Sequence, residues 1–224
     1  MNNNLIVKYR TLGIIFLIVL LAFAILFSFI SIREKKDVAF KLKMFFSEMT
    51  QTLQFSTSTN GQPSEWNLSS DGNLDSLKLY IIDGLRVSKD CLNAKGNCFA
   101  KTAYKNLANK YSCFYPNQHP SVVLQNGIAI AFEAKGSCKN INEVCYIFYV
   151  DVNSIEPPNV IGKDLFAFEF INSHTSSFRP YGLSDYSSVI SDKTYGCSKK
   201  AEVPLYCSSL LFSKNWRVEK DYPW

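Results

Sequence analysis

The side chains best suited to bind a ligand lie in one loop, DVNSIEPPNVIGKD, at residues 151–164. The loop offers five oxygen-bearing side chains: Asp151, Asn153, Glu156, Asn159 and Asp164. A hard cation takes about six to eight oxygen ligands, often from Asp, Asn and backbone carbonyl groups, so the loop predicts a calcium site. The glycine spacing of an EF-hand is absent. The alternative is a structural loop, in which Asp and Asn cap turns, two prolines stiffen the chain and Gly162 adopts an unusual φ.

The cysteines form a second chemically distinctive group. They are Cys91, Cys98, Cys113, Cys138, Cys145, Cys197 and Cys207. This density favours an oxidising compartment over the cytosol. Sequential pairing joins 91 to 98, 138 to 145 and 197 to 207 and leaves Cys113 over, although spacing alone does not fix connectivity. Structural zinc is the alternative, but zinc sites usually show shorter-spaced Cys and His pairs.

The chain shows no arrangement of residues typical of a catalytic site. It has no GxSxG elbow and no glycine-rich phosphate loop, and its two histidines, His119 and His174, lie in loop-like segments without a triad context. Glu133 and Glu169 fall in predicted strands, where alternation favours solvent-facing carboxylates over an acid–base pair. We therefore expect neither an enzyme nor a small-molecule substrate.

Charge argues against nucleic acid as a partner. The net charge is +5. Most of the basic excess falls within residues 1–55, and the remainder of the chain is nearly neutral. A nucleic-acid binder needs clustered Lys and Arg on its folded part to neutralise phosphates.

Residues 12–30, LGIIFLIVLLAFAILFSFI, carry no charged side chain and are long enough to cross a bilayer as a helix. The alternative is a cleaved secretory signal, but its apolar region is usually about 7–15 residues long. The span instead runs into Arg33, Glu34, Lys35 and Lys36, which favours a retained anchor in contact with the lipid bilayer. Counting positive charges alone would place the body inside the cell, whereas the cysteines favour the outside.

Helical periodicity continues beyond this span. Apolar residues recur with helical spacing at Leu42, Phe45, Phe46, Met49 and Leu53. We expect one helix from about residue 5 to 55, whose stripe packs on its own domain; a coiled-coil partner is the alternative. The segment 56–73 is polar and without a period, which predicts a linker. It contains the sequon Asn67-Leu68-Ser69, which would matter only in a glycosylating secretory pathway and which we interpret as a chance match.

The C-terminal half of the sequence has the apolar pattern of a β-sheet. A second helix is predicted after residue 71 or 73 and a short third element within 98–111, and LYCSSLLF predicts one or two helical turns. Period-two segments predict strands at 121–125, 128–134, 145–152 and 165–171 and about 177–181, with an Asn126-Gly127 hairpin turn. A long helix followed by a four-stranded antiparallel meander is an α+β plan.

Several segments resemble type IV pilins and type II secretion pseudopilins. They are LQNGIAIAF (124–132), VDVNSIEPPNVIGKDLFAF (150–168), FRPYG (178–182), NWRVEKDYPW (215–224) and the helical EKKDVAFKLKMFFSEMTQTL (34–53). The resemblance implies a pilin-like fold, with a long N-terminal transmembrane helix packed on a small antiparallel β-sheet. It also implies a single-pass protein of the inner membrane, with a cytoplasmic N-terminus and an extracytoplasmic domain.

The N-terminus departs from that family pattern. Members carry a Gly followed by Phe-Thr-Leu and a Glu at the fifth mature position, whereas LIVKYRTLGIIFLIVLL (5–21) has no Gly-Phe junction and places Arg10 near the expected Glu. An arginine would not neutralise a neighbour's terminal amine in an apolar filament core. The resemblance therefore does not imply leader cleavage, methylation or ordinary filament incorporation.

The function expected from these observations is that of a noncatalytic, pilin-like membrane protein. It would be a minor or divergent component of a type IV pilus or type II secretion pseudopilus, and its partners would be other pilin or pseudopilin subunits contacted through the N-terminal helix. The alternative is a stand-alone bitopic surface protein with a ligand-binding or adhesive domain. The expected layout is a cytoplasmic segment 1–11, a span 12–30, a helical continuation 31–55, a linker 56–73 and an extracytoplasmic domain 74–224.

Overall fold

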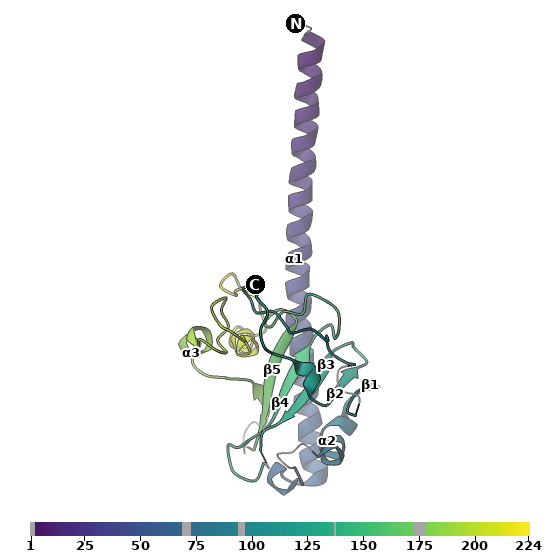
Figure 1. The fold of residues 1–224 in the computed structure, drawn as a ribbon, viewed down its shortest axis with the longest axis vertical. Coiled ribbons are helices and arrows are strands. Elements are labelled where there is room, and N and C mark those ends of the chain that lie inside the picture. Colours follow the sequence, from purple (N-terminus) through teal and green to yellow (C-terminus); the bar gives the residue numbers. More distant parts are fainter. Residues whose placement is uncertain (1–2, 69–72, 94–96, 137, 173–177) are drawn as a thin grey trace. The chain divides into compact units, whose positions relative to one another are not determined.

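The fold is known from a computed structural model, which describes residues 3–68, 73–93, 97–136, 138–172 and 178–224 (Figure 1). The chain divides into two units, Met1–Asp37 and Val38–Trp224. One helix, α1 (Asn3–Asn60), begins in the first unit and ends in the second. Most described side chains of residues 12–30 are exposed, and α1 is long and apolar enough to cross a membrane. Length and composition alone do not separate such a span from a signal sequence.

Within the second unit, α1 buries one apolar stripe. Leu42, Phe45 and Met49 are fully buried and Leu53 is nearly so, as the helical spacing predicts. The phenyl ring of Phe45 packs edge-on against that of Phe168, with ring centroids 5.2 Å apart. The stripe therefore packs on the protein's own sheet.

α1 is longer than the sequence predicts, because it ends at Asn60 and not near residue 55. The hydroxyl of Thr57 donates to the Leu53 carbonyl at 2.8 Å, and that of Thr59 donates to the Phe55 carbonyl at 3.0 Å. Such bonds to the preceding turn satisfy polar side chains within a helix. The residues that follow are also not a free linker, since Trp66 and Leu68 are buried in the core. Part of the predicted linker, 69–72, lies outside the described residues.

The sheet has six antiparallel strands in sequence order and is larger than the predicted four-stranded meander; five strands fall in the predicted strand segments, and β1 does not. They are β1 (Val87–Asp90), β2 (Ser121–Leu124), β3 (Ala129–Ala134), β4 (Val144–Asp151), β5 (Leu165–Ile171) and β6 (Phe178–Pro180). The unpredicted β1 is a short edge strand with Lys89 and Asp90, and its register shifts between Val87 and Lys89. Charge and irregularity of this kind protect an edge from further pairing and also hide the period-two pattern.

The β2–β3 turn forms where the Asn126-Gly127 pair predicts it, but only Gly127 of the two has a positive φ, at 84°. The Gly127 amide donates to the Leu124 carbonyl at 3.0 Å, and the Asn126 side chain accepts from the Ile128 amide at 3.1 Å. The turn therefore spans 124–127, one residue earlier than a two-residue loop made of the pair itself.

The short helices are α2 (Leu74–Tyr80), α3 (Tyr186–Ser191) and α4 (Cys207–Ser213), with 3-10 turns η1 (Pro63–Glu65), η2 (Ile82–Gly84) and η3 (Pro116–Gln118). α2 and α4 confirm the predicted second helix and C-terminal helical turns. The Asn73 side chain caps α2 by accepting from the amide of Asp75 at 3.0 Å.

The sheet is covered on both faces. Phenylalanines of its inner face, including Phe148, Phe168 and Phe178, join the α1 stripe in one core. The outer face contributes Ala131, Tyr149 and other residues to a second core. Irregular chain within 91–93, 97–115 and 194–206 covers this face. No helix or strand lies within 98–111, so the short third element predicted there is wrong. Two covered faces explain why every residue of β5 is buried.

Candidate functional site

Asp151 anchors the start of the 151–164 loop from inside the protein. It is the last residue of β4 and is fully buried. Its carboxylate accepts one hydrogen bond from the Tyr104 hydroxyl at 2.5 Å and another from the Asn153 amide at 3.0 Å. The second bond is the turn-capping contact that an Asp makes to the backbone two residues on.

Asp164 anchors the other end of the loop. It is 3% exposed, and its two carboxylate oxygens accept from the backbone amides of Asn159 and Val160, each at 2.6 Å. The backbone also closes the loop, since the Val152 amide donates to the Asp164 carbonyl at 2.9 Å. Both aspartates therefore hold backbone amides, as in the structural alternative drawn from the sequence.

The two carboxylates are close enough to repel each other. Burial raises the pKa of Asp164 to about 6, although the amides of Val160 and Asn159 oppose that rise. Burial and then the charge of Asp164 raise the pKa of Asp151 well above its usual range. Burial also raises the pKa of Tyr104, so this phenol stays protonated and donates to Asp151. Two like charges in a poorly solvated place favour a proton or a cation there.

The five predicted calcium ligands do not form one cluster of carboxylates. Glu156 is exposed, whereas Asp151 and Asp164 are buried. The side-chain oxygens of Asn153 and Asn159 are buried and have no hydrogen-bond partner. Among the residues that the structure describes, no group of three or more His, Cys, Asp or Glu side chains could hold a metal. Calcium would therefore depend on two carboxylates with amide and carbonyl oxygens, and it stays a prediction.

Two residues that position this loop escaped sequence reasoning. Tyr104 lies 47 positions before Asp151. The Lys41 ammonium group, on α1, donates to the Val152 carbonyl at 3.2 Å across 111 positions. Neither contact follows a periodic pattern, so no local signal could have found it.

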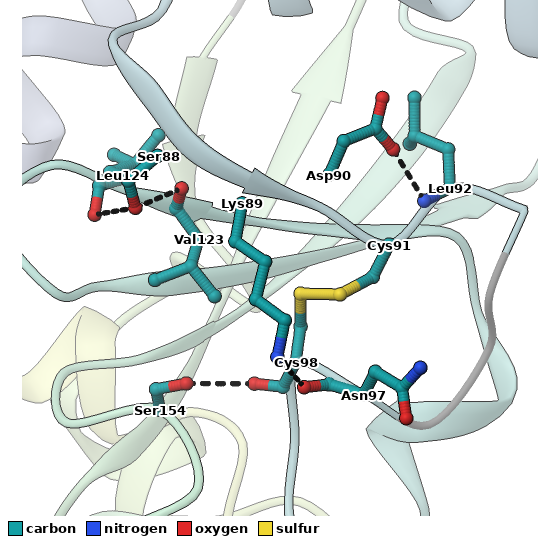
Figure 2. Close-up of a disulfide and its surroundings, with 10 residues drawn as sticks. All are labelled: Ser88, Lys89, Asp90, Cys91, Leu92, Asn97, Cys98, Val123, Leu124 and Ser154. Carbon is teal, nitrogen blue, oxygen red and sulfur yellow. Dashed lines mark hydrogen bonds between the residues drawn. A yellow bond between two sulfur atoms is a disulfide. The ribbon is translucent and has the colours of Figure 1, made fainter.

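The structure joins six cysteines in sequential order: Cys91 to Cys98, Cys138 to Cys145, and Cys197 to Cys207. Cys113 is a free, exposed thiol. Figure 2 shows the first disulfide just beyond β1, where the Lys89 ammonium group donates to the Asn97 carbonyl at 2.6 Å. The hydroxyl of Ser154 donates to the Cys98 carbonyl at 2.9 Å, which ties the 151–164 loop to this disulfide (Figure 2).

The two strand glutamates lie in one cross-strand row of the sheet, with Ile147 between them. Glu169 is buried and pairs with Arg179 at 2.5 Å. Burial raises the pKa of Glu133, but hydrogen bonds from Lys135 and Tyr149 outweigh it and lower the pKa overall. Glu169 pairs with Arg179, and Glu133 pairs with Lys135. Because Glu169 is buried, the prediction of a solvent-facing carboxylate is wrong for this residue.

The structure describes one of the two histidines. His119 packs its ring near that of Tyr149, with centroids 5.6 Å apart. His174 lies outside the described residues.

The aromatic C-terminal tail packs on the domain. Tyr222 is buried and its hydroxyl donates to the Gly162 carbonyl at 2.6 Å. Trp216 stacks near Phe168, with ring centroids 6.3 Å apart. The tail therefore braces the 151–164 loop.

The solvent side of α1 within the second unit carries large apolar side chains. Phe40 is 62% exposed, Met44 is 51% exposed and Phe55 is 68% exposed. With Ser47 and Gln51 they follow the spacing i, i+4, i+7, i+11, i+15, which places them along one helical face. We call these five residues the outer stripe.

Comparison with known proteins identifies a family but no activity. Residues 28–224 match the model of DUF6613, a family of unknown function, and the chain belongs to this family. No curated protein and no solved structure matches the chain.

Proposed function

For this member of DUF6613, we propose the function of a noncatalytic, membrane-anchored, pilin-like subunit of a pilus or secretion pseudopilus. The apolar segment 12–30 would hold the chain in the inner membrane, and the second unit would lie outside the cytoplasm. Its role would be assembly, through contacts of α1 with the helices of other subunits.

The outer stripe is the observation that carries the proposal. A helix that serves only its own domain needs one apolar face, and α1 already has that face in Leu42, Phe45 and Met49. Phe40, Met44 and Phe55 stand opposite it and remain exposed. Exposed apolar side chains arranged along a helix are suited to packing against another helix.

The α+β architecture is consistent with the proposal. One long helix packs its stripe on an antiparallel sheet, and the segments that resemble pilins form β2–β3, the β4–β5 connection and the packed tail. The disulfides suit an extracytoplasmic domain.

The outer stripe can be tested by crosslinking in native membranes. A photo-crosslinking residue at position 44 should capture other pilin-like subunits, and Met44→Lys should abolish their co-purification. Leu79→Lys is the matched control, because Leu79 is 54% exposed but lies on α2. Equal loss of co-purification with Met44→Lys and Leu79→Lys, or a crosslinking residue at position 44 that captures no subunit, would contradict assembly through the outer stripe.

The alternative is a stand-alone bitopic surface protein that never polymerises. The sequence feature that favours it is the absent Gly-Phe junction, together with Arg10 near the place of the usual Glu. Intact mass and N-terminal sequencing of the native protein separate the two functions. A shortened, methylated N-terminus supports assembly, whereas an intact Met1 supports the surface protein.

A further inference from the structure

Asn67 is presented to solvent between two buried neighbours. Trp66 is 2% exposed and Leu68 is 3% exposed, whereas Asn67 is exposed. The Trp66 indole stacks on the Tyr80 ring at 4.8 Å between centroids, and its N–H donates to the Gly61 carbonyl at 3.0 Å. These contacts fix the backbone on either side and direct the intervening side chain outward.

The backbone at this point makes a tight turn. The Leu68 amide donates to the Trp66 carbonyl at 2.8 Å, an i to i+2 bond that closes a three-residue turn with Asn67 at its apex. The Ser76 hydroxyl donates to the Asn67 carbonyl at 2.5 Å and secures the turn to α2. Over the described part of the chain, the Asn67 side-chain amide takes part in no hydrogen bond.

Asn67 is also the single asparagine of the sequence with a hydroxyl residue two positions later. Asn67-Leu68-Ser69 has no proline in the middle and is therefore an acceptor sequence for N-linked glycans. Ser69 itself lies outside the described residues. We propose that Asn67 is an N-glycosylation site, on which the folded domain carries an oligosaccharide.

The transfer needs a lipid-pyrophosphate-linked oligosaccharide and an oligosaccharyltransferase. The side-chain amide nitrogen of Asn67 forms a bond to the anomeric carbon of the first sugar. The bond from that carbon to the pyrophosphate oxygen breaks, and the lipid pyrophosphate leaves with the electron pair. The nitrogen loses one proton, so the products are a glycosyl-asparagine and the free lipid pyrophosphate.

The folded domain is compatible with this product. The side chains that stabilise the turn belong to Trp66, Leu68 and Ser76, and a glycan on Asn67 replaces none of their contacts. A bulky, hydrated substituent is tolerated where the side chain already points into water. The inference rests on the proposed extracytoplasmic placement, because this acceptor sequence is glycosylated on surface loops of secreted proteins.

The test is glycopeptide mass spectrometry on the full-length protein from its native membrane. The peptide containing Asn67 should carry a mass increment made of sugar units. Asn67→Gln and Ser69→Ala should abolish the increment, whereas Ser69→Thr should retain it because it keeps the hydroxyl. A fully unmodified wild-type peptide, or an increment that survives Asn67→Gln, would overturn the proposal.

Labelling of the exposed Cys113 thiol tests the extracytoplasmic placement independently of glycosylation. A membrane-impermeant maleimide should label Cys113 on cells whose outer layers are permeabilised and whose cytoplasmic membrane is intact. Labelled Cys113 with unmodified Asn67 overturns glycosylation alone. A thiol protected until the cytoplasmic membrane is opened overturns the extracytoplasmic placement, and glycosylation with it. Cys113→Ser gives the background.

Discussion

At the residue scale, the base of the 151–164 loop concentrates buried polar groups. Asp151 and Asp164 are held by hydrogen bonds from Tyr104 and from backbone amides. Carboxylates in such a place are tolerated because each carboxylate oxygen of Asp151 and Asp164 accepts a hydrogen bond. Removing one donor should therefore cost more than the hydrogen bond itself contributes.

Tyr104→Phe should destabilise the domain by about 1–3 kcal/mol, the usual cost of leaving a buried acceptor unsatisfied. The change deletes only the hydroxyl that donates to Asp151, and the ring still fills its buried site. Urea unfolding of the full-length protein in detergent measures the effect. Tyr111→Phe is the matched control, because Tyr111 is 70% exposed, and it should change the free energy of unfolding very little.

The pKa of Asp164 predicts a dependence of stability on pH. Because burial raises this pKa from 3.8 in the unfolded chain to about 6 in the folded one, folding takes up a proton between these values. The contribution is complete below about pH 4 and is lost as the pH rises through 6. Carboxylates with lowered pKa, such as Glu133, act in the opposite direction, so the wild type must be compared with Asp164→Asn.

That comparison needs melting temperatures between pH 4 and pH 8 in the presence of a chelator. The advantage of the wild type over Asp164→Asn should shrink as the pH rises. An advantage that is constant or grows with pH would show that Asp164 does not take up a proton on folding.

Bound calcium should offset the repulsion between the Asp151 and Asp164 carboxylates at neutral pH. The melting temperature should rise when calcium is added and fall with chelator. At a free calcium concentration of one hundred times Kd, the free energy of unfolding should increase by about 2.7 kcal/mol. Asp164→Asn should lose the shift, whereas Glu156→Gln should keep it because Glu156 is exposed at the loop surface. The absence of a shift with either calcium or chelator would remove the calcium prediction.

At the scale of the elements, α1 has two apolar faces with different expected roles. Phe45→Ala should destabilise the domain by about 3–5 kcal/mol, because it removes a fully buried ring that packs against Phe168 and Phe178. The neighbouring Met44→Ala should lie within about 0.5 kcal/mol of the wild type, because Met44 belongs to the outer stripe. Chemical denaturation of both variants measures the contrast, and similar losses would mean that Met44 also packs on its own domain.

The elements differ in how far the sequence predicts them. The buried stripe of α1 and strands β3 to β5 follow clear periods of apolar residues, and the structure confirms them. β1 has a single apolar residue among VSKD, so pairing with β2 forms it against local preference. The end of α1 was missed because Thr57 and Thr59 satisfy their hydroxyls within the helix. Composition reports polarity but not where a polar group finds its partner.

At the scale of the whole molecule, local sequence patterns also predict only part of the candidate site. The sequence places Asp151 and Asp164 at the two ends of one loop, and the structure brings both carboxylates to its base. The sequence gives no indication that Tyr104 and Lys41 contact this loop, since both reach it through tertiary contacts. Burial of the aspartates is likewise a consequence of the second core on the outer face of the sheet.

The three disulfides each close a short loop of the domain, and at the scale of the whole molecule they can be counted. Alkylation of the native protein under denaturing, nonreducing conditions should modify one of its seven cysteines, Cys113, because the other six are paired. Reduction before alkylation should expose all seven. Cys113→Ser should then show no modification without reduction. Three or more modified thiols without reduction would mean that at least one pair is open in the native protein, and the cysteines would no longer support an oxidising compartment.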